Sequence, residues 1–168
     1  MPVAPLDSIA SGADILLDAN ILIYALTESS EQCRRLLGRC ASEELCGVTT
    51  VEIVNETCHR LMLAEALHAG LISAAQAKLL RAKRTAIPSF SEYWTKTKQL
   101  FGLGFLVIGL EEQRVRRAHE MRKRYALLTN DSLIIAAADE YGIRGLASND
   151  ADFDDIPWLT VYKPGDIL

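Results

Sequence analysis

The chain has the length and composition of one globular domain. It has 168 residues, of which 49% are hydrophobic and 24% charged, and this excludes a disordered or fibrous class. The formal net charge of −4 excludes a global attraction to nucleic acid, so any such binding needs a local basic patch. The four cysteines form no C-x-x-C pair, which favours small buried side chains in a reducing cytosol over a zinc ribbon or a disulfide framework.

The amino-terminal segment predicts neither an export signal nor a membrane span. Residues 1–12 contain Pro, Ser and Gly and are expected to form a loose arm. They lack a basic stretch followed by an apolar one, and the later apolar run 15–26 is too short and too polar to cross a bilayer. We therefore predict a cytoplasmic protein without a membrane association.

The hydrophobic pattern predicts strands that alternate with helices. In chain order, the expected elements are a strand at 14–18, helices at 20–30 and 31–41, a strand at 45–50, helices at 51–70, 73–84 and 91–101, a buried strand at 104–110, helices at 111–126 and 129–142, and strands at 144–150 and 159–164. This order is typical of an α/β fold with a mainly parallel sheet. No repeat or linker divides the chain, which predicts a single domain over residues 1–168.

Acidic residues stand near the ends of several predicted strands. Asp18 and Asp150 each end a strand, and Glu56 lies one to two turns into the helix after another. Functional groups of parallel sheets gather outside the carboxyl ends of the strands, so these side chains are expected to converge. Asp131 stands at the start of a helix whose apolar body should pack on the sheet. Taken singly, each has an ordinary structural explanation as a cap, a turn residue or part of a solvated helix face.

Together, however, these four carboxylates predict a cation site. Without compensating Lys or Arg, they would repel one another and have raised pKa values, a conflict that a bound hard cation resolves. Oxygen ligands without His or Cys favour Mg²⁺ or Mn²⁺. Such an ion activates water and stabilises the charge that develops on a phosphodiester, so the pattern indicates hydrolysis without a protein nucleophile.

Four segments of the chain resemble the PIN-domain family, which includes the VapC-type toxin ribonucleases of toxin–antitoxin pairs. The segments are "LLDANILIYAL", "TTVEIVNETCHRLM", "LLTNDSLIIAAADEYGI" and "LASNDADFDDIPWLTVYKP". The resemblance implies a three-layer α/β/α sandwich with a mainly parallel central sheet. It also implies an Mg²⁺- or Mn²⁺-dependent endoribonuclease, the toxin of such a pair, with RNA as substrate and an antitoxin protein as partner.

The resemblance also assigns residue roles. The acidic quartet of the family corresponds to Asp18, Glu56, Asp131 and Asp150 as catalytic metal ligands, with Asn20, Ser148 and Asp152 as accessory groups. Glu56 is preferred to Glu52 because the family places its Glu about seven residues after a strand-end Ser or Thr, here Thr49, but Glu52 stays open. For the acidic cluster at Asp152, Asp154 and Asp155, a solvated turn is the alternative.

The middle of the chain departs from a compact family member. Residues 71–100 form a longer predicted helical insertion that carries several cations: Lys78, Arg81, Lys83, Arg84, Lys96 and Lys98. In the family this region commonly builds a helical hairpin beside the active-site groove and contributes to dimerisation, so we expect a homodimer. The choice of RNA cannot be transferred from relatives here.

A basic helix is the candidate RNA contact. On a helical wheel, "RVRRAHEMRKRY" places Arg116, Arg117, Lys123 and Arg124 toward solvent, where they are suited to sequence-independent phosphate contacts. The alternative is an ordinary solvated helix face. Tyr93 and Trp94 have the chemistry to stack on unpaired bases, with core or dimer packing as the alternative.

Two other functions compete with the nuclease. One is a PIN-fold RNA-binding or protein-interaction module without significant catalysis, against which the presence of all four acidic matches argues. The other is a flavodoxin-like phospho-acceptor domain, which needs one strand-end Asp but neither Glu56 nor Asp131. No strand-end Lys partner for such a domain is evident.

Overall fold

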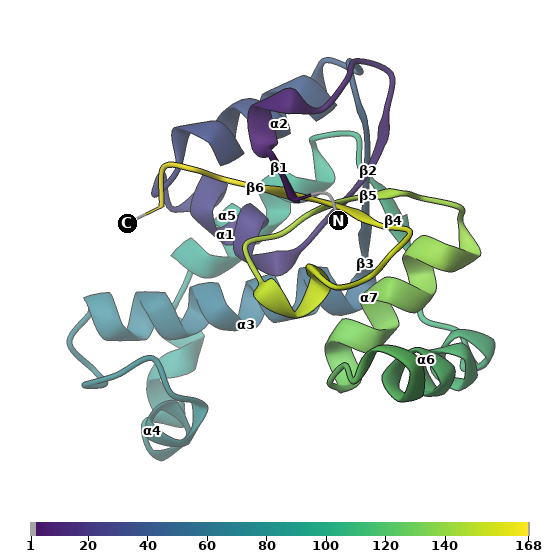
Figure 1. Ribbon diagram of the computed structural model, residues 1–168. Helices are drawn as coiled ribbons and strands as arrows, with labels where there is room; N and C mark the ends of the chain where they lie inside the picture. Colours follow the sequence, from purple (N-terminus) through teal and green to yellow (C-terminus); the bar gives the residue numbers. More distant parts are fainter. Residues whose placement is uncertain (1–2, 168) are drawn as a thin grey trace.

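The computed structural model describes residues 3–167, which contain one parallel sheet of six strands (Figure 1). The strands are β1 (Val3–Pro5), β2 (Asp14–Leu17), β3 (Cys46–Thr50), β4 (Leu106–Ile108), β5 (Gly145–Ala147) and β6 (Thr160–Lys163). Their spatial order is β1-β6-β5-β2-β3-β4, and every pairing is parallel. The predicted α/β fold with a parallel sheet is therefore confirmed.

Helices cover both faces of this sheet. They are α1 (Ala19–Leu26), α2 (Glu31–Ala41), α3 (Val51–His68), α4 (Ala77–Ala82), α5 (Glu92–Phe101), α6 (Glu112–Tyr125) and α7 (Thr129–Glu140), with 3-10 segments η1 (Leu6–Ser8), η2 (Arg84–Ser89) and η3 (Ala151–Phe153). Figure 1 shows α1 and α2 on one side of the strands and α7 on the other. This is the predicted three-layer sandwich. No helix within residues 3–167 is long and apolar enough to cross a membrane.

The strand order reverses between β2 and β5, at the middle of the sheet. From β2 the chain continues outward to β3 and β4, then returns to the other side of β2 and adds β5 and β6. In open α/β sheets, ligands bind in the crevice outside the carboxyl ends of the strands at such a reversal. The topology therefore predicts a binding site at the residues directly after Leu17 of β2 and Ala147 of β5.

The core holds these central strands rigidly. Ile15, Leu16 and Leu17 of β2 and Leu146 of β5 are fully buried, as is Ile135 on the α7 face that packs against the sheet. Burial of each such side chain contributes roughly 1.5–3 kcal/mol. Side chains that come after β2 and β5 therefore start from fixed backbone positions.

The cysteines partly fit the expectation of small buried side chains. None of the four forms a disulfide; Cys33 and Cys40 are buried, Cys58 is half-buried and Cys46 is exposed. Burial raises the pKa of Cys33 and of Cys40 to about 11, which leaves both as thiols. A Cβ on Gly47 would lie 3.0 Å from Cys40 Sγ, so glycine is the residue that lets α2 pack this closely on β3.

Three local predictions were wrong. The expected loose arm 1–12 is packed from residue 3 onward, because Val3–Pro5 pairs with β6 and Leu6 and Ile9 are buried; residues 1–2 lie outside the described residues. The helix expected at 73–84 begins only at Ala77, and 3-10 structure continues from Arg84 through Pro88. The strand within 104–110 is only partly buried: β4 is a sheet edge, Leu106 is 51% exposed, and Ile108 alone of its three residues is buried.

A single carboxylate fastens α5 to α3. Glu65 on α3 accepts hydrogen bonds from the backbone N–H groups of Ser91 (2.9 Å), Glu92 (3.2 Å) and Tyr93 (2.8 Å), the unpaired donors at the start of α5. Desolvation acts to raise the pKa of the Glu65 carboxyl, but the three amides and the charge of Lys96 outweigh it and lower the pKa. The start of α5, the last helix of the insertion, is thus held by a side chain of α3.

We expect Glu65→Ala to destabilise the protein by about 1 kcal/mol at pH 7, since it leaves the start of α5 without its acceptor. Because the folded-state pKa of Glu65 is lowered, its contribution is present above the ordinary Glu pKa of about 4.3 and is lost as the pH falls through the folded-state value. Urea unfolding at pH 7 and pH 3 measures both effects.

Glu92→Ala is the matched control, because within residues 3–167 the exposed Glu92 side chain makes its one ion pair with Lys96. Its expected cost is below about 0.5 kcal/mol. Equal stability of wild type and Glu65→Ala at pH 7 would show that the cap contributes nothing.

Candidate functional site

Asp18 is a buried carboxylate whose charge is held by hydrogen bonds. It comes directly after β2, is 6% exposed, and accepts bonds from Ala19 N at 2.7 Å and from Asn20 Nδ2 and Ser148 Oγ at 2.6 Å each. As the N-cap of α1 it also lies at the positive end of that helix. The apolar run 15–26 can therefore contain an Asp, because donors from both sides of the strand reversal satisfy it.

Ser148 and Asn20 join the ends of β2 and β5 around Asp18. Ser148 Oγ accepts from Asp150 N at 3.0 Å, and Asn20 Oδ1 accepts from Asn149 N at 3.0 Å. Asn20 Nδ2 also lies 3.3 Å from Ser148 Oγ. The two side chains predicted as accessory groups therefore hold the loop after β5 against the first turn of α1.

Asp150 and Asp152 lie on the continuation of that loop. Asp150 Oδ1 accepts from Asp152 N at 3.0 Å and caps η3. Asp150 is half-buried and Asp152 is exposed. The alternative of a solvated turn fits Asp155, which is exposed. It does not fit Asp154, whose carboxylate pairs with Lys163 Nζ at 2.8 Å.

Asp131, from the fourth predicted segment, lies near Asp18 and Asp150. It is half-buried in the first turn of α7. Desolvation is the first cause that raises its pKa, with the charges of Asp150, Asp152 and Asp18 next, while a backbone hydrogen bond at Leu128 acts in the other direction. The charges of three carboxylates from two other segments therefore act on the start of α7.

The pKa of Asp18 is also affected by neighbouring carboxylates. Burial is the main cause that raises its pKa; the hydrogen bonds from Ser148 and Ala19 oppose this, and the charges of Glu56 and Asp150 add to it. Among the described residues, the nearest cation paired with this group is Arg60, 3.8 Å from Glu56 Oε1. The four predicted carboxylates thus form one electrostatic cluster, here called the acidic pocket: Asp18, Glu56, Asp131 and Asp150.

Glu52 and Glu56 differ in exposure, although they lie one turn apart on α3. The side chain of Glu56 is 37% exposed. Both carboxylate oxygens of Glu52 are buried, and neither has a hydrogen-bond partner within residues 3–167. A carboxylate closed to solvent is poorly placed to meet an ion or substrate that arrives from solvent. The geometry therefore favours Glu56 for the pocket.

The acidic pocket fits a divalent cation by its donor chemistry. Within residues 3–167, no group of three or more His, Cys, Asp or Glu side chains stands ready as a metal cage. Mg²⁺ does not need one, since it keeps several of its waters and uses one or two carboxylates. The pocket offers oxygen donors alone, and its carboxylates mutually raise the pKa values of Asp18 and Asp131. A bound cation would relieve that repulsion.

The cations of α6 are less available than the helical wheel suggests. Arg116 pairs with Glu112 and Arg117 pairs with Asp139, while Arg124 stacks over the Tyr125 ring at 5.4 Å. Lys123 is exposed. Two of the four predicted RNA-contacting residues thus already have carboxylate partners.

Sequence reasoning missed Arg122 on the same helix. Its Nη1 donates to Ser132 Oγ at 3.0 Å, beside Asp131. The residue lies ten positions before its partner, and its half-buried state was not evident from the wheel. The position of Arg122 on the helix, next to the buried Ala118 and Met121, was the feature of the sequence that could have indicated its partial burial.

The fold defines a class of proteins: α/β sandwiches with a parallel sheet, in which a candidate site lies at the strand reversal, outside the carboxyl ends of the central strands. Comparison with known families narrows the class, because the model of the PIN domain matches residues 15–159. The chain belongs to the PIN-domain family.

Curated relatives cover nearly the whole chain. It is similar to Ribonuclease VapC6 of Methanocaldococcus jannaschii, with 23% identity over 154 residues that span 91% of this chain and 99% of the relative. It is also similar to Ribonuclease VapC2 of the same organism, with 26% identity over 149 residues that span 89% of this chain and 93% of the relative.

Solved structures share the fold. VapBC2 from Rickettsia felis bound to a promoter DNA fragment matches with a TM-score of 0.58 and 17% identity, over 89% of this chain and 98% of that chain. VapC20 of Mycobacterium tuberculosis, a sarcin-ricin loop cleaving toxin, matches with a TM-score of 0.56 and 13% identity, over 86% of this chain and 96% of that chain. At this identity the likeness establishes the fold.

We expect Asp131→Asn to raise the melting temperature of the metal-free protein by about 2 °C at pH 7.5. A raised folded-state pKa means that stability is lost as the pH rises through that value, and the neutral amide avoids the loss. The gain is below about 1 kcal/mol, because solvent screens this half-exposed group. It should vanish below the ordinary Asp pKa of about 3.9.

Asp18→Asn is the informative comparison, and we expect it to lower the melting temperature. An amide at Asp18 has one acceptor oxygen, so its NH₂ group must face either Ala19 N or the pair of Asn20 Nδ2 and Ser148 Oγ, all of which now donate to the carboxylate. Thermal unfolding with EDTA, monitored by circular dichroism, measures both variants. A rise for Asp18→Asn as large as that for Asp131→Asn would contradict this role of the hydrogen bonds.

Proposed function

We propose that this chain is a metal-dependent endoribonuclease that hydrolyses RNA phosphodiester bonds and serves as the toxin of a toxin–antitoxin pair. Residues 1–168 form a single PIN-like nuclease domain in this proposal. The observation that carries it is the acidic pocket at the strand reversal, where the charges of Glu56 and Asp150 act on Asp18, and those of Asp150 and Asp18 act on Asp131. The two VapC ribonuclease relatives support the same activity.

Each pocket residue has a role in this proposal. Asp18, Glu56, Asp131 and Asp150 hold Mg²⁺ or Mn²⁺ and form the catalytic set. Such an ion, when bound, supplies a water of lowered pKa and stabilises charge on the phosphodiester. Ser148 and Asn20 keep the Asp18 carboxylate oriented through their 2.6 Å hydrogen bonds. Asp152, whose charge acts on Asp131, is an accessory group.

The same proposal includes partners for the chain. Structural neighbours include VapBC toxin–antitoxin complexes, which supports a cognate antitoxin for this chain. We also propose a homodimer, and an RNA substrate places the protein in the cytoplasm. On α6, Lys123 and Arg124 are the proposed phosphate contacts that lack a carboxylate partner in the described residues, whereas Arg116 and Arg117 would have to leave theirs.

The pair Glu56→Gln and Glu52→Gln tests the pocket on a single helix. We expect Glu56→Gln to lower cleavage about 100-fold or more, because it removes a charged ligand from the set. Glu52→Gln, the same change one turn earlier and closed to solvent, should stay within about threefold of wild type. The assay measures cleavage of a mixed panel of single-stranded and structured RNAs with Mg²⁺, Mn²⁺ or EDTA.

Circular dichroism confirms that each variant is folded before activity is compared. Full activity of Glu56→Gln with normal metal dependence would overturn the assignment of the quartet. RNA binding by wild type without cleavage in any metal would favour the non-catalytic RNA-binding module instead.

Ser148→Ala tests whether orientation of Asp18 matters. The variant removes one of three donors to the carboxylate, and losses of 10–100-fold in activity or metal affinity are typical when such supporting groups are removed. We expect the Mg²⁺ concentration for half-maximal cleavage to rise, with partial recovery at high Mg²⁺. An unchanged Mg²⁺ titration would show that Ser148 has only a structural role.

A further inference from the structure

The acidic pocket creates a binding problem for its own substrate. Four carboxylates at the carboxyl end of the sheet repel a polyanion, and the whole chain has a net charge of −4. Affinity for RNA must therefore come from cations outside the pocket. On α6, the guanidinium groups of Arg116 and Arg117 are partly neutralised by Glu112 and Asp139.

The insertion carries the opposite charge pattern. Between Glu65 and Glu92 the sequence contains no acidic residue, yet it holds four Lys or Arg: Lys78, Arg81, Lys83 and Arg84. All four are exposed, and none makes an ion pair with another residue of the described part. We call residues 77–89, which comprise α4 and η2, the basic arm.

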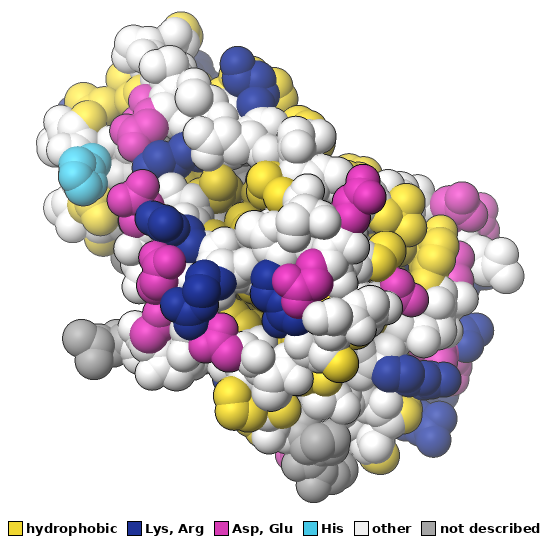
Figure 2. Space-filling view, turned by 90° about the horizontal axis from the view of Figure 1, so that it is seen from above, with side chains coloured by type: hydrophobic (Ala, Val, Ile, Leu, Met, Phe, Trp, Pro, Cys, Tyr) yellow, Lys and Arg dark blue, Asp and Glu magenta, His cyan; other side chains and the backbone are white. Residues whose placement is uncertain are grey.

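The opposite end of the molecule differs from the basic arm in how its cations are paired. Figure 2 looks onto that end, and its Lys and Arg side chains lie beside Asp and Glu. Arg34 pairs there with Glu31, and Arg35 with Asp7. Cations on that end are mostly compensated, whereas those of the basic arm are not.

The basic arm is fixed to the body by its own small core. Leu80 of α4 and Ile72 are buried against Leu63 and Ala66 of α3, with Ile87 and Phe90 packed around them. Glu65 anchors the next helix, α5, through three backbone amides. The cations thus stand on a packed element and lose less conformational freedom on binding than cations on a loose loop.

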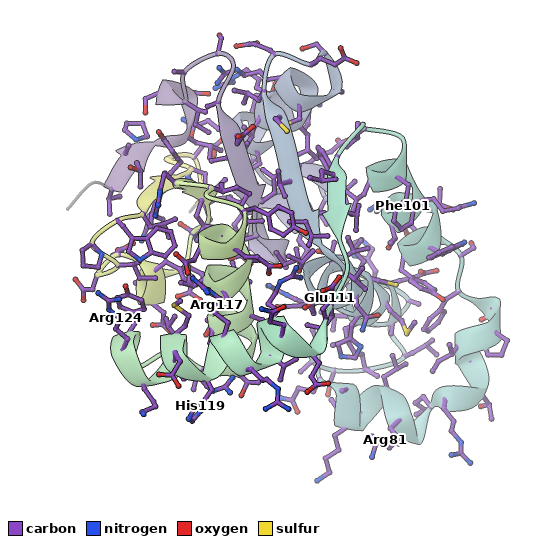
Figure 3. All side chains as sticks on the ribbon, turned by 90° about the vertical axis from the view of Figure 1, so that its right-hand side faces the viewer. Arg81, Phe101, Glu111, Arg117, His119 and Arg124 are labelled. Carbon is purple, nitrogen blue, oxygen red and sulfur yellow. The ribbon has the colours of Figure 1, made fainter. Side chains whose placement is uncertain are left out.

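Position links the basic arm to the pocket. Figures 1 and 3 show α4, with Arg81, and α6, with Arg117 and Arg124, at the same end of the molecule and on opposite sides of it. That end carries Glu56, near the start of α3, while α4 packs near Ala66. Ten residues of helix separate Glu56 from Ala66, or about 15 Å, which is the rise of four to five nucleotides of a stacked strand at about 3.4 Å each.

We infer that the basic arm binds the phosphate backbone of the RNA several nucleotides from the bond that is cut. The inference rests on the proposed nuclease function and adds to it a second, sequence-independent contact. The arm then supplies affinity, and the acidic pocket supplies chemistry. Because its contacts are to phosphates, the arm does not select a base sequence.

Binding of a fluorescein-labelled 30-nucleotide single-stranded RNA, measured by anisotropy in EDTA, tests the inference without cleavage. Arg81→Gln/Arg84→Gln should weaken binding at 50 mM salt and lower the slope of log affinity against log salt by about 1.4, since each phosphate contact contributes about 0.7. Its deficit relative to wild type should shrink about sevenfold between 50 and 200 mM salt.

Arg34→Gln/Arg35→Gln is the charge-matched control, since it removes two exposed arginines from α2. It should keep the wild-type slope. Equal slopes for the two double variants, or an arm variant that binds like wild type, would overturn the inference. A change in the dimer dissociation constant, with RNA binding unaltered, would instead assign the arm to an interface between two copies and would also overturn it.

Cleavage separates this inference from the proposed function. With Mg²⁺ or Mn²⁺, the arm variant should lose kcat/KM but keep kcat at saturating RNA, since the pocket is untouched. RNA that binds in an arm-dependent way but is never cut contradicts the nuclease and leaves the arm supported. Normal cleavage with unaltered affinity contradicts the arm alone.

Discussion

The buried carboxylate of Asp18 is the constraint on which the site depends. At 6% exposure, hydrogen bonds from Ala19, Asn20 and Ser148 stabilise its charged form against the burial that raises its pKa. Two of these donors come from the turn after β2, and the third comes from the turn after β5. These hydrogen bonds therefore link the segments that follow β2 and β5 in their observed register. They also keep Asp150, two residues after Ser148, at the same edge of the sheet.

That register also explains why a stable fold can hold a repulsive cluster. Ile15, Leu16 and Leu17 of β2 are buried and pair with β5, which is buried throughout, so the apolar core holds the backbone from which the carboxylates project. Burial is the main cause that raises the pKa values of Asp18 and Asp131, and the charges of the neighbouring carboxylates add to it. Both raised pKa values occur at the edge of the sheet that carries the candidate site, and perturbed pKa values are typical of functional sites.

Local patterns predicted much of this structure and failed where distant residues decide. Period and flanking residues identified β2, α2 and α7 because these elements bury apolar faces of their own. The arm 1–12 was misjudged because β1 is defined by pairing with β6, at the other end of the chain. Likewise, the wheel placed Arg117 in solvent but had no means to show Asp139 on α7 as its partner.

The distribution of charge results from the chemistry that the pocket needs. A site of carboxylates attracts a cation and repels the phosphodiester that the cation must meet, and cations placed inside the pocket would compete with the metal ion. The repulsion falls steeply with distance in salt, with a Debye length of about 8 Å under physiological conditions. The basic arm packs near Ala66, about 15 Å along α3 from Glu56, so its cations leave the pocket negative and still lie within reach of the same RNA strand. The basic arm, which has no acidic residue and packs on the far half of α3, meets both conditions, which a basic patch beside Asp18 would not.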